Sequence, residues 1–153
     1  MYVAIWDGIK LMNFENFFMC ELVCCLILTG LIWTIQLVHY PSFLFVDKMR
    51  FSTFEKFHTN RICILVLPLM MLEATAGVYI WINSEINEPI FLWNVLGISL
   101  TWISTFVLSV PCHKKLGAGY DKTVIERLIL TNWPRTILWT ARSALLISIR
   151  TLK

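Results

Sequence analysis

The sequence predicts an all-α integral membrane protein, a four-helix bundle with short interfacial amphipathic helices. Three observations predict this class: a very apolar composition, four long apolar stretches and an uneven distribution of basic residues. Of the 153 residues, 58% are hydrophobic and 15% are charged, whereas soluble domains carry about 25% charged residues. A bilayer accommodates this apolar surface because it is itself an apolar solvent. We therefore treat residues 1–153 as a single transmembrane domain.

The first apolar stretch covers residues 16–40 and stops at the sequence His39-Tyr40-Pro41. A helix of about 24 residues rises about 36 Å, which is enough to cross a bilayer with some tilt. Glu21 is expected near the outer boundary, where its carboxylate reaches water. The preceding segment, 2–14, is expected to be either an interfacial helix or an extension of this span.

The second predicted span covers residues 61–83. Ser52 and Glu55 have the spacing of a capping box, so a helix should begin near Thr53 and continue directly into the membrane. Pro68 is expected to kink this helix, because proline cannot donate a backbone hydrogen bond and its ring crowds the preceding turn.

The third and fourth predicted spans cover residues 90–110 and 134–149. The fourth span is the less apolar one. Pro134 suits the first turn of its helix, with Asn132 as the expected cap. Residues 121–132 have the pattern of a short amphipathic helix that lies at the membrane interface.

The basic residues predict the orientation of these spans. Most of them fall in the segments 41–61 and 112–135, and we interpret them as an orientation signal and not as a nucleic-acid-binding surface. They are Lys48, Arg50, Lys56, Arg61, Lys114, Lys115, Lys122, Arg127 and Arg135. The remaining basic residues outside the spans are Lys10, Arg150 and Lys153. The positive-inside rule then predicts that both termini lie on the non-cytoplasmic side of a membrane such as the bacterial inner membrane. The N-terminal segment lacks a signal-peptide pattern, and we expect it to be retained.

Three histidines, His39, His58 and His113, fall near one membrane boundary in this topology. Neutral imidazole is the commonest metal ligand, and two histidines from different helices can hold a haem iron. We expect these histidines to bind haem b or a transition-metal ion. Glu73 or Glu126 would add an oxygen ligand to a non-haem metal, and haem propionates would meet Arg135, Arg61 or Lys114. The chain would then be a cofactor-binding membrane protein, and it could be an oxidoreductase. No catalytic residue is singled out.

Two other functions stay open. Trp133, Arg135 and Trp139 stand where a helix begins at the basic interface, a setting that suits a lipid headgroup, a quinone or a similar amphipathic ligand. The chain could instead be a non-catalytic subunit of a membrane complex, or a small channel or proton pathway that requires a homo-oligomer.

Glu73 and Arg142 are the charged residues expected deepest in the spans. Glu73 lies about 18 Å below Arg61, and Arg142 lies about 12 Å below Pro134. A charge at such depth is costly unless it has a partner or a water-filled cavity. We therefore expect these two side chains to form an ion pair, or to be bridged by water, inside the bundle.

Several common chemistries are not indicated by the sequence. It contains no phosphate-binding loop, dinucleotide fingerprint, nucleophile elbow or zinc-protease helix. No lysine lies in a predicted span, which argues against a retinal Schiff base. The five cysteines form no CxxC pair and are expected to act mostly as buried small hydrophobes.

Overall fold

The computed structural model describes residues 2–84 and 89–151, with side chains from residue 13 onward. The described residues form helices joined by short turns, without a strand. In chain order these are α1 (Tyr2–Thr34), the π-helical segment η1 (Ile35–His39), α2 (Tyr40–Ser42), η2 (Phe43–Phe45), α3 (Phe51–Asn83), α4 (Pro89–Ser104), the π-helical segment η3 (Thr105–Ser109), α5 (Val110–Leu116) and α6 (Lys122–Thr151). The all-helical prediction is therefore confirmed for this part of the chain.

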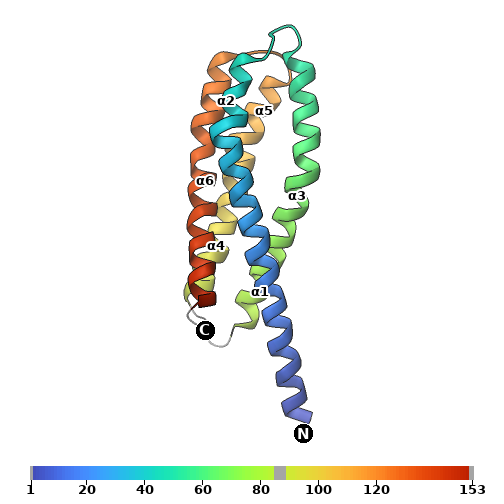
Figure 1. Ribbon diagram of the computed structural model, residues 1–153, viewed down its shortest axis with the longest axis vertical. Helices are drawn as coiled ribbons and strands as arrows, with labels where there is room; N and C mark the ends of the chain where they lie inside the picture. The colour runs from blue at the N-terminus through green and yellow to red at the C-terminus, as the bar shows by residue number, and fades with distance from the viewer. Residues whose placement is uncertain (1, 85–88, 152–153) are drawn as a thin grey trace.

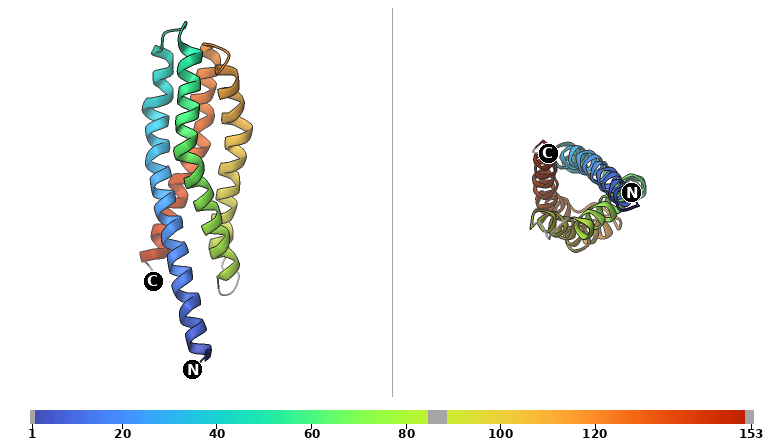
Figure 2. Two further views of the ribbon diagram at one scale, coloured as in Figure 1. Left: turned by 90° about the vertical axis from the view of Figure 1, so that its right-hand side faces the viewer. Right: turned by 90° about the horizontal axis from the view of Figure 1, so that it is seen from below.

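In the described residues these elements make up four long helical rods: α1 to η2, α3, α4 to α5, and α6. The rods lie side by side (Figure 1). The rod of α1 contacts those of α3 and α6, and the rod of α4 contacts the same two. Viewed along their length, the rods surround a common interior (Figure 2). Both ends of the described chain lie at one end of the molecule, and α1 extends beyond the other helices there (Figure 1). The turns 46–50 and 117–121 lie at the opposite end, which we call the turn end.

Polarity is distributed across these rods in the reverse of the pattern of a water-soluble bundle. Large apolar side chains point outward: Ile64 is 69% exposed and Ile137 is 61% exposed. Polar side chains are buried instead, including Asn132 at 0% and Arg142 at 3%. Contact with water would leave the outer apolar surface unfavourably hydrated, whereas lipid would not.

Three helical rods in the described residues are long and apolar enough to cross a membrane. They are Asn13–Phe45, Phe51–Asn83 and Pro89–Leu116. The fourth rod, α6, has 30 residues and is therefore about 45 Å long. Polar and charged residues, among them Arg135 and Arg142, lower its hydropathy, but these two side chains are buried between the rods.

Of the two structures predicted for residues 2–14, an interfacial helix or an extension of the first span, the second is found. Helix α1 begins at Tyr2 and runs without interruption to Thr34, so residues 2–14 extend the first span. The side chain of Lys10 and the whole of Lys153, both counted in the charge prediction, lie outside the described part of the structure.

The prediction of a separate interfacial helix over residues 121–132 is wrong. Helix α6 runs continuously through Pro134. Asn132, the predicted cap, is an internal helical residue, and its Nδ2 donates to Gln36 Oε1 at 2.9 Å. Proline suits the first turn of a helix, which is why Pro134 was expected there. In the structure, packing of α6 against the first rod compensates for the backbone hydrogen bond that proline cannot make.

The predicted capping box at the start of α3 is also wrong. The helix begins at Phe51 and the capping residue is Arg50, without a side-chain cap. Ser52 Oγ instead donates to the carbonyl of Gly117 at 2.7 Å, which ties α3 to the second turn. Glu55 is thereby free to engage another side chain, described below. The prediction that this helix runs directly into the second span is confirmed.

Two π-helical segments lie near the turn end, each immediately before an X-Pro sequence. Segment η1 precedes Tyr40-Pro41, and η3 precedes Val110-Pro111. Proline has no amide hydrogen, and its ring crowds the carbonyl four residues earlier. Widening the helix by one residue relieves this crowding, and such π-bulges recur at functional sites. Here one bulge ends at His39, which belongs to the cluster described next, and the other ends at Ser109, which accepts a hydrogen bond from Arg135 beside that cluster.

Candidate functional site

The three histidines come together at the turn end. His39 Nε2 and His58 Nδ1 are 2.7 Å apart and share a hydrogen bond. The rings of His58 and His113 have their centroids 5.5 Å apart. His39 and His113 are partly exposed, whereas His58 is 6% exposed. Two of the three imidazoles are thus partly exposed.

Tyr40 and Glu55 complete this group, which we call the histidine cluster: His39, Tyr40, Glu55, His58 and His113. His113 Nδ1 lies 2.6 Å from Glu55 Oε1. Its other nitrogen, Nε2, lies 3.0 Å from the hydroxyl of Tyr40. The imidazole therefore connects a buried carboxylate to a buried phenol. Because histidine both accepts and donates protons near neutral pH, this chain of three groups can pass a proton between its ends.

Arg135 borders the histidine cluster from α6. Its Nη1 donates to Ser109 Oγ at 2.9 Å, and the guanidinium lies over the ring of Trp139 at 5.4 Å. The sequence-based interpretation placed this arginine at the membrane surface, but it is 6% exposed and faces the interior.

Three buried atoms in this region have no hydrogen-bond partner among the described residues: Glu55 Oε2, His58 Nε2 and Arg135 Nε. Burying a polar atom without a partner costs about 1–3 kcal/mol, more when the group is charged. Native proteins leave few such atoms, and each calls for an explanation such as a ligand or an ordered water. The three atoms offer both donor and acceptor capacity.

Two residues predicted for the site lie elsewhere. Trp133 points outward, with 37% exposure, and packs edge-on against Trp33 at 5.8 Å. Glu73 lies 15 residues beyond His58 on α3, a separation of about 22 Å, so the structure does not bring it to the histidines as a ligand. Among the described residues, no group of three His, Cys, Asp or Glu side chains is arranged to hold a metal ion.

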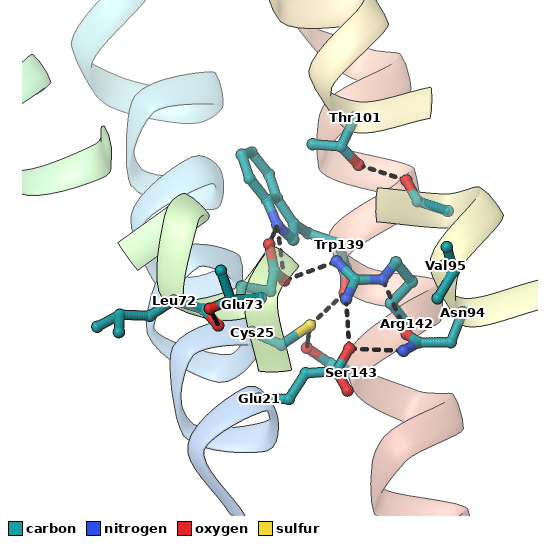
Figure 3. Close-up of polar contacts among 12 residues, drawn as sticks. Glu21, Cys25, Leu72, Glu73, Asn94, Val95, Thr101, Trp139, Arg142 and Ser143 are labelled. Carbon is teal, nitrogen blue, oxygen red and sulfur yellow. Dashed lines mark hydrogen bonds and ion pairs between the residues drawn. The ribbon is translucent and has the colours of Figure 1, made fainter. Parts of the chain in front are cut away.

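Glu73 belongs to a second buried group, the charge cluster, shown in Figure 3. Glu73 Oε1 lies 2.6 Å from Arg142 Nη1, so the two residues predicted to pair are in direct contact. Arg142 Nη2 also binds Glu21 Oε1 at 3.0 Å. Arg142 Nε donates to Asn94 Oδ1 at 3.1 Å. Since these side chains come from α1, α3, α4 and α6, the guanidinium connects all four rods.

The remaining contacts of the charge cluster fix the carboxylates. Trp139 Nε1 donates to both oxygens of Glu73 at 3.2 Å. Asn94 Nδ2 donates to Glu21 Oε1 at 2.5 Å. Glu21 is fully buried, and the expectation that it reaches water at the membrane boundary is therefore wrong. Its position along the first span does not reveal that Arg142 and Asn94, which come from other rods, contact its carboxyl group.

Two glycines make room for the charge cluster. A Cβ atom at Gly77 would lie 2.9 Å from Glu21 Oε1 and 2.5 Å from Ile98 Cδ1. A Cβ atom at Gly97 would lie 2.7 Å from Arg142 Cδ. These separations are too short for packed atoms. The glycines on α3 and α4 thus let the charged side chains pass between the helices.

Sequence reasoning missed Tyr40, Glu55, Glu21 and Asn94 as site residues. Glu55 carried a signal, because it precedes His58 by three residues and therefore shares its helix face, but the capping interpretation accounted for it. Tyr40 adjoins His39 in the sequence, and nothing in the spacing indicates that it turns toward His113.

We expect Gly77→Ala and Gly97→Ala to destabilise the protein by about 1–3 kcal/mol each, because the added methyl group overpacks the charge cluster. Gly30→Ala is the matched control, since nothing lies within 4 Å of a Cβ atom there. It should be neutral or stabilise α1 by up to about 1 kcal/mol. Unfolding in mixed micelles with a denaturing detergent measures all three. Equal stabilities for the three variants would contradict the close approach.

We also expect strong energetic coupling between Glu73 and Arg142. Removing one partner of a buried ion pair leaves an uncompensated charge and costs about 3–5 kcal/mol. The double substitution Glu73→Gln with Arg142→Gln should therefore be less destabilised than the sum of the two single variants. A double-mutant cycle by the same unfolding assay measures the coupling, and additive single effects would rule it out.

A comparison with protein-family models, curated proteins and solved structures finds no match to this chain. Its function must therefore be argued from the chemistry of the two clusters.

Proposed function

We propose that this chain is an integral membrane four-helix bundle that binds a quinone-like molecule at the histidine cluster. The cluster carries the protons that the ligand takes up or releases when an external redox partner reduces the quinone or oxidises the quinol. The observation that carries the proposal is the set of three buried atoms without partners beside the Tyr40–His113–Glu55 chain. They are Glu55 Oε2, His58 Nε2 and Arg135 Nε. A bound molecule that supplies both acceptors and donors would satisfy them.

Membrane insertion is supported by the inverted polarity of the rods. Three rods are long and apolar enough to cross a bilayer. In α6 the polar residues point inward while residues such as Leu130 and Ile137 point outward. A fourth span is therefore compatible with lipid on its outer face, although its overall hydropathy is low. With four spans and the positive-inside rule, both termini lie on the non-cytoplasmic side.

A quinone matches the free atoms better than an anionic lipid headgroup. Its carbonyl oxygens accept hydrogen bonds, which suits Arg135 Nε–H and a protonated His58 Nε2. Its reduced form carries hydroxyl groups, and these can donate to Glu55 Oε2. A phosphate offers acceptors at neutral pH and would meet the Glu55 carboxylate as a like charge. The aromatic rings of Phe43 and Phe54, packed against His39, add an apolar border typical of cofactor sites.

Proton exchange is supported by the order of groups in the cluster. Tyr40, His113 and Glu55 form a continuous hydrogen-bonded chain, and His113 is partly exposed at the turn end. A proton that enters or leaves a ligand beside Tyr40 can therefore be exchanged with the outside through the imidazole. Which nitrogen carries the proton depends on the tautomer.

A haem or metal ion, expected from the three histidines, has less support. His39 Nε2 and His58 Nδ1 face each other in a hydrogen bond, and both nitrogens of His113 are engaged by Tyr40 and Glu55. Coordination would require these side chains to exchange their present partners for the metal. No specific observation favours a non-catalytic subunit of a membrane complex or an oligomeric channel.

The binding proposal predicts that purified protein in mild detergent binds decylubiquinone, a quinone with a short tail. Tryptophan fluorescence should report binding, since Trp139 lies beneath Arg135. Because hydrogen bonds that involve charged groups contribute about 1.5–3 kcal/mol, Arg135→Gln, Glu55→Gln and His58→Phe, which each remove or alter one of the three free atoms, should each weaken binding roughly tenfold or more.

Glu126→Gln is the control, because this carboxylate is exposed and pairs with Lys122 at the surface. It should bind decylubiquinone as the unaltered protein does. No binding, or equal affinity in all variants, would refute the quinone site. An absorption spectrum with a Soret band, or stoichiometric metal by elemental analysis, would instead restore the haem or metal prediction.

The four-span topology predicts opposite outcomes for reporters placed at Gly119 and after Lys153. Alkaline phosphatase, which is active only outside the cytoplasm, should be active at the C-terminus and inactive when inserted at Gly119 in the second turn. A fluorescent protein that folds in the cytoplasm should give the reverse pattern. The same result at both positions would show that α6 does not cross the membrane.

A further inference from the structure

The charge cluster contains more negative groups than positive ones. Glu21 on α1 is faced by Glu73 on α3 and by Arg142 on α6, whereas α4 contributes the uncharged Asn94. The thiols of Cys24 and Cys25 on α1 are the neighbouring titratable groups, and Cys25 interacts with Ser143 at 3.4 Å. Two ionised carboxylates and one guanidinium would give the cluster a net charge of about −1.

The surroundings do not tolerate such a net charge. Glu21, Glu73 and Arg142 are 0%, 1% and 3% exposed. An uncompensated charge in a membrane interior is costly, and buried groups relieve the cost by becoming neutral. When two carboxylates share one site, the ionisation of one opposes the ionisation of the other. The cluster therefore needs one further positive charge.

The hydrogen bonds indicate which of the two carboxylates binds the additional positive group. Both oxygens of Glu73 accept from donors, Oε1 from Arg142 and Trp139 and Oε2 from Trp139. Glu21 Oε1 accepts from Arg142 and Asn94. Glu21 Oε2 is buried and has no partner among the described residues. A negatively charged oxygen without a donor is the least favourable of these positions.

A proton meets this charge requirement better than a metal cation does. Hard cations are held by about six oxygen ligands. In the charge cluster the other oxygens are already occupied by Arg142, Trp139 and Asn94, so Glu21 Oε2 stands alone among the described residues. A proton needs one oxygen.

We propose that Glu21 holds a proton, which makes the charge cluster neutral and creates a buried proton-binding site between the four rods. This site is separate from the histidine cluster and does not depend on the function proposed for it. Release of the proton would place a net negative charge between the close-packed helices around Gly77 and Gly97. Proton binding at Glu21 thereby couples to the packing of all four rods.

Infrared spectroscopy of the purified protein at neutral pH tests this site. A protonated carboxyl group has a carbonyl band above the amide region, and the band shifts when the proton exchanges for deuterium. We expect the full-length protein to show this band and Glu21→Gln to lose it. Glu15→Gln, which alters an exposed pair with Arg150, and Glu55→Gln should retain it. Absence of the band from the unaltered protein, or its persistence in Glu21→Gln, would overturn the proposal.

A second pair of variants keeps the test decisive when Glu21→Gln does not fold. Asn94→Leu removes a donor to Glu21 Oε1, so the band should move to higher frequency. Trp139→Phe removes one of the two donors to Glu73 and should leave the band in place. The opposite pattern, a shift with Trp139→Phe alone, would assign the proton to Glu73 and refute the assignment to Glu21.

Discussion

The buried guanidinium of Arg142 is the interaction on which the arrangement of the rods depends. It contacts Glu21, Glu73 and Asn94, and these partners come from three different rods. A buried charge that loses a partner is strongly destabilising. The rods must therefore meet at one depth and in one rotation. In lipid, where apolar contacts do not distinguish a helix neighbour from an acyl chain, such polar contacts determine which helix faces meet.

The two glycines follow from the same constraint. Glutamate and arginine side chains can meet at the centre only where the opposing backbones leave space, and Gly77 and Gly97 provide it. Hydrogen bonds between uncharged side chains also join the α1 and α6 rods at other depths. Gln36 joins Asn132, and Thr29 joins Ser143 at 2.7 Å. Polar contacts between the α1 and α6 rods thus recur from the charge cluster toward the turn end.

The histidine cluster has a different character, because it is open on one side and incompletely hydrogen-bonded. His39 and His113 are partly exposed, whereas Glu55, His58 and Arg135 are buried with one polar atom of each left without a partner among the described residues. A purely structural network would be expected to satisfy these atoms. The two π-helical segments, which shift His39 and Ser109 relative to a regular helix, add a local distortion of the kind found at functional sites. These features make the turn end the favoured place for chemistry.

The sequence by itself determined the helical class, the three apolar spans and the depth at which Glu73 and Arg142 could meet, because these follow from composition, hydropathy and the rise of a helix. It also placed the three histidines at one end. It could not show that α6 continues through Pro134, since that continuity depends on packing against the first rod. Nor could it assign Glu55 to His113, because a capping box explains the same spacing. The partners of Glu21, Asn94 and Tyr40 were decided by the tertiary structure alone, because the rotation of each helix about its axis is fixed by contacts between residues distant in the chain.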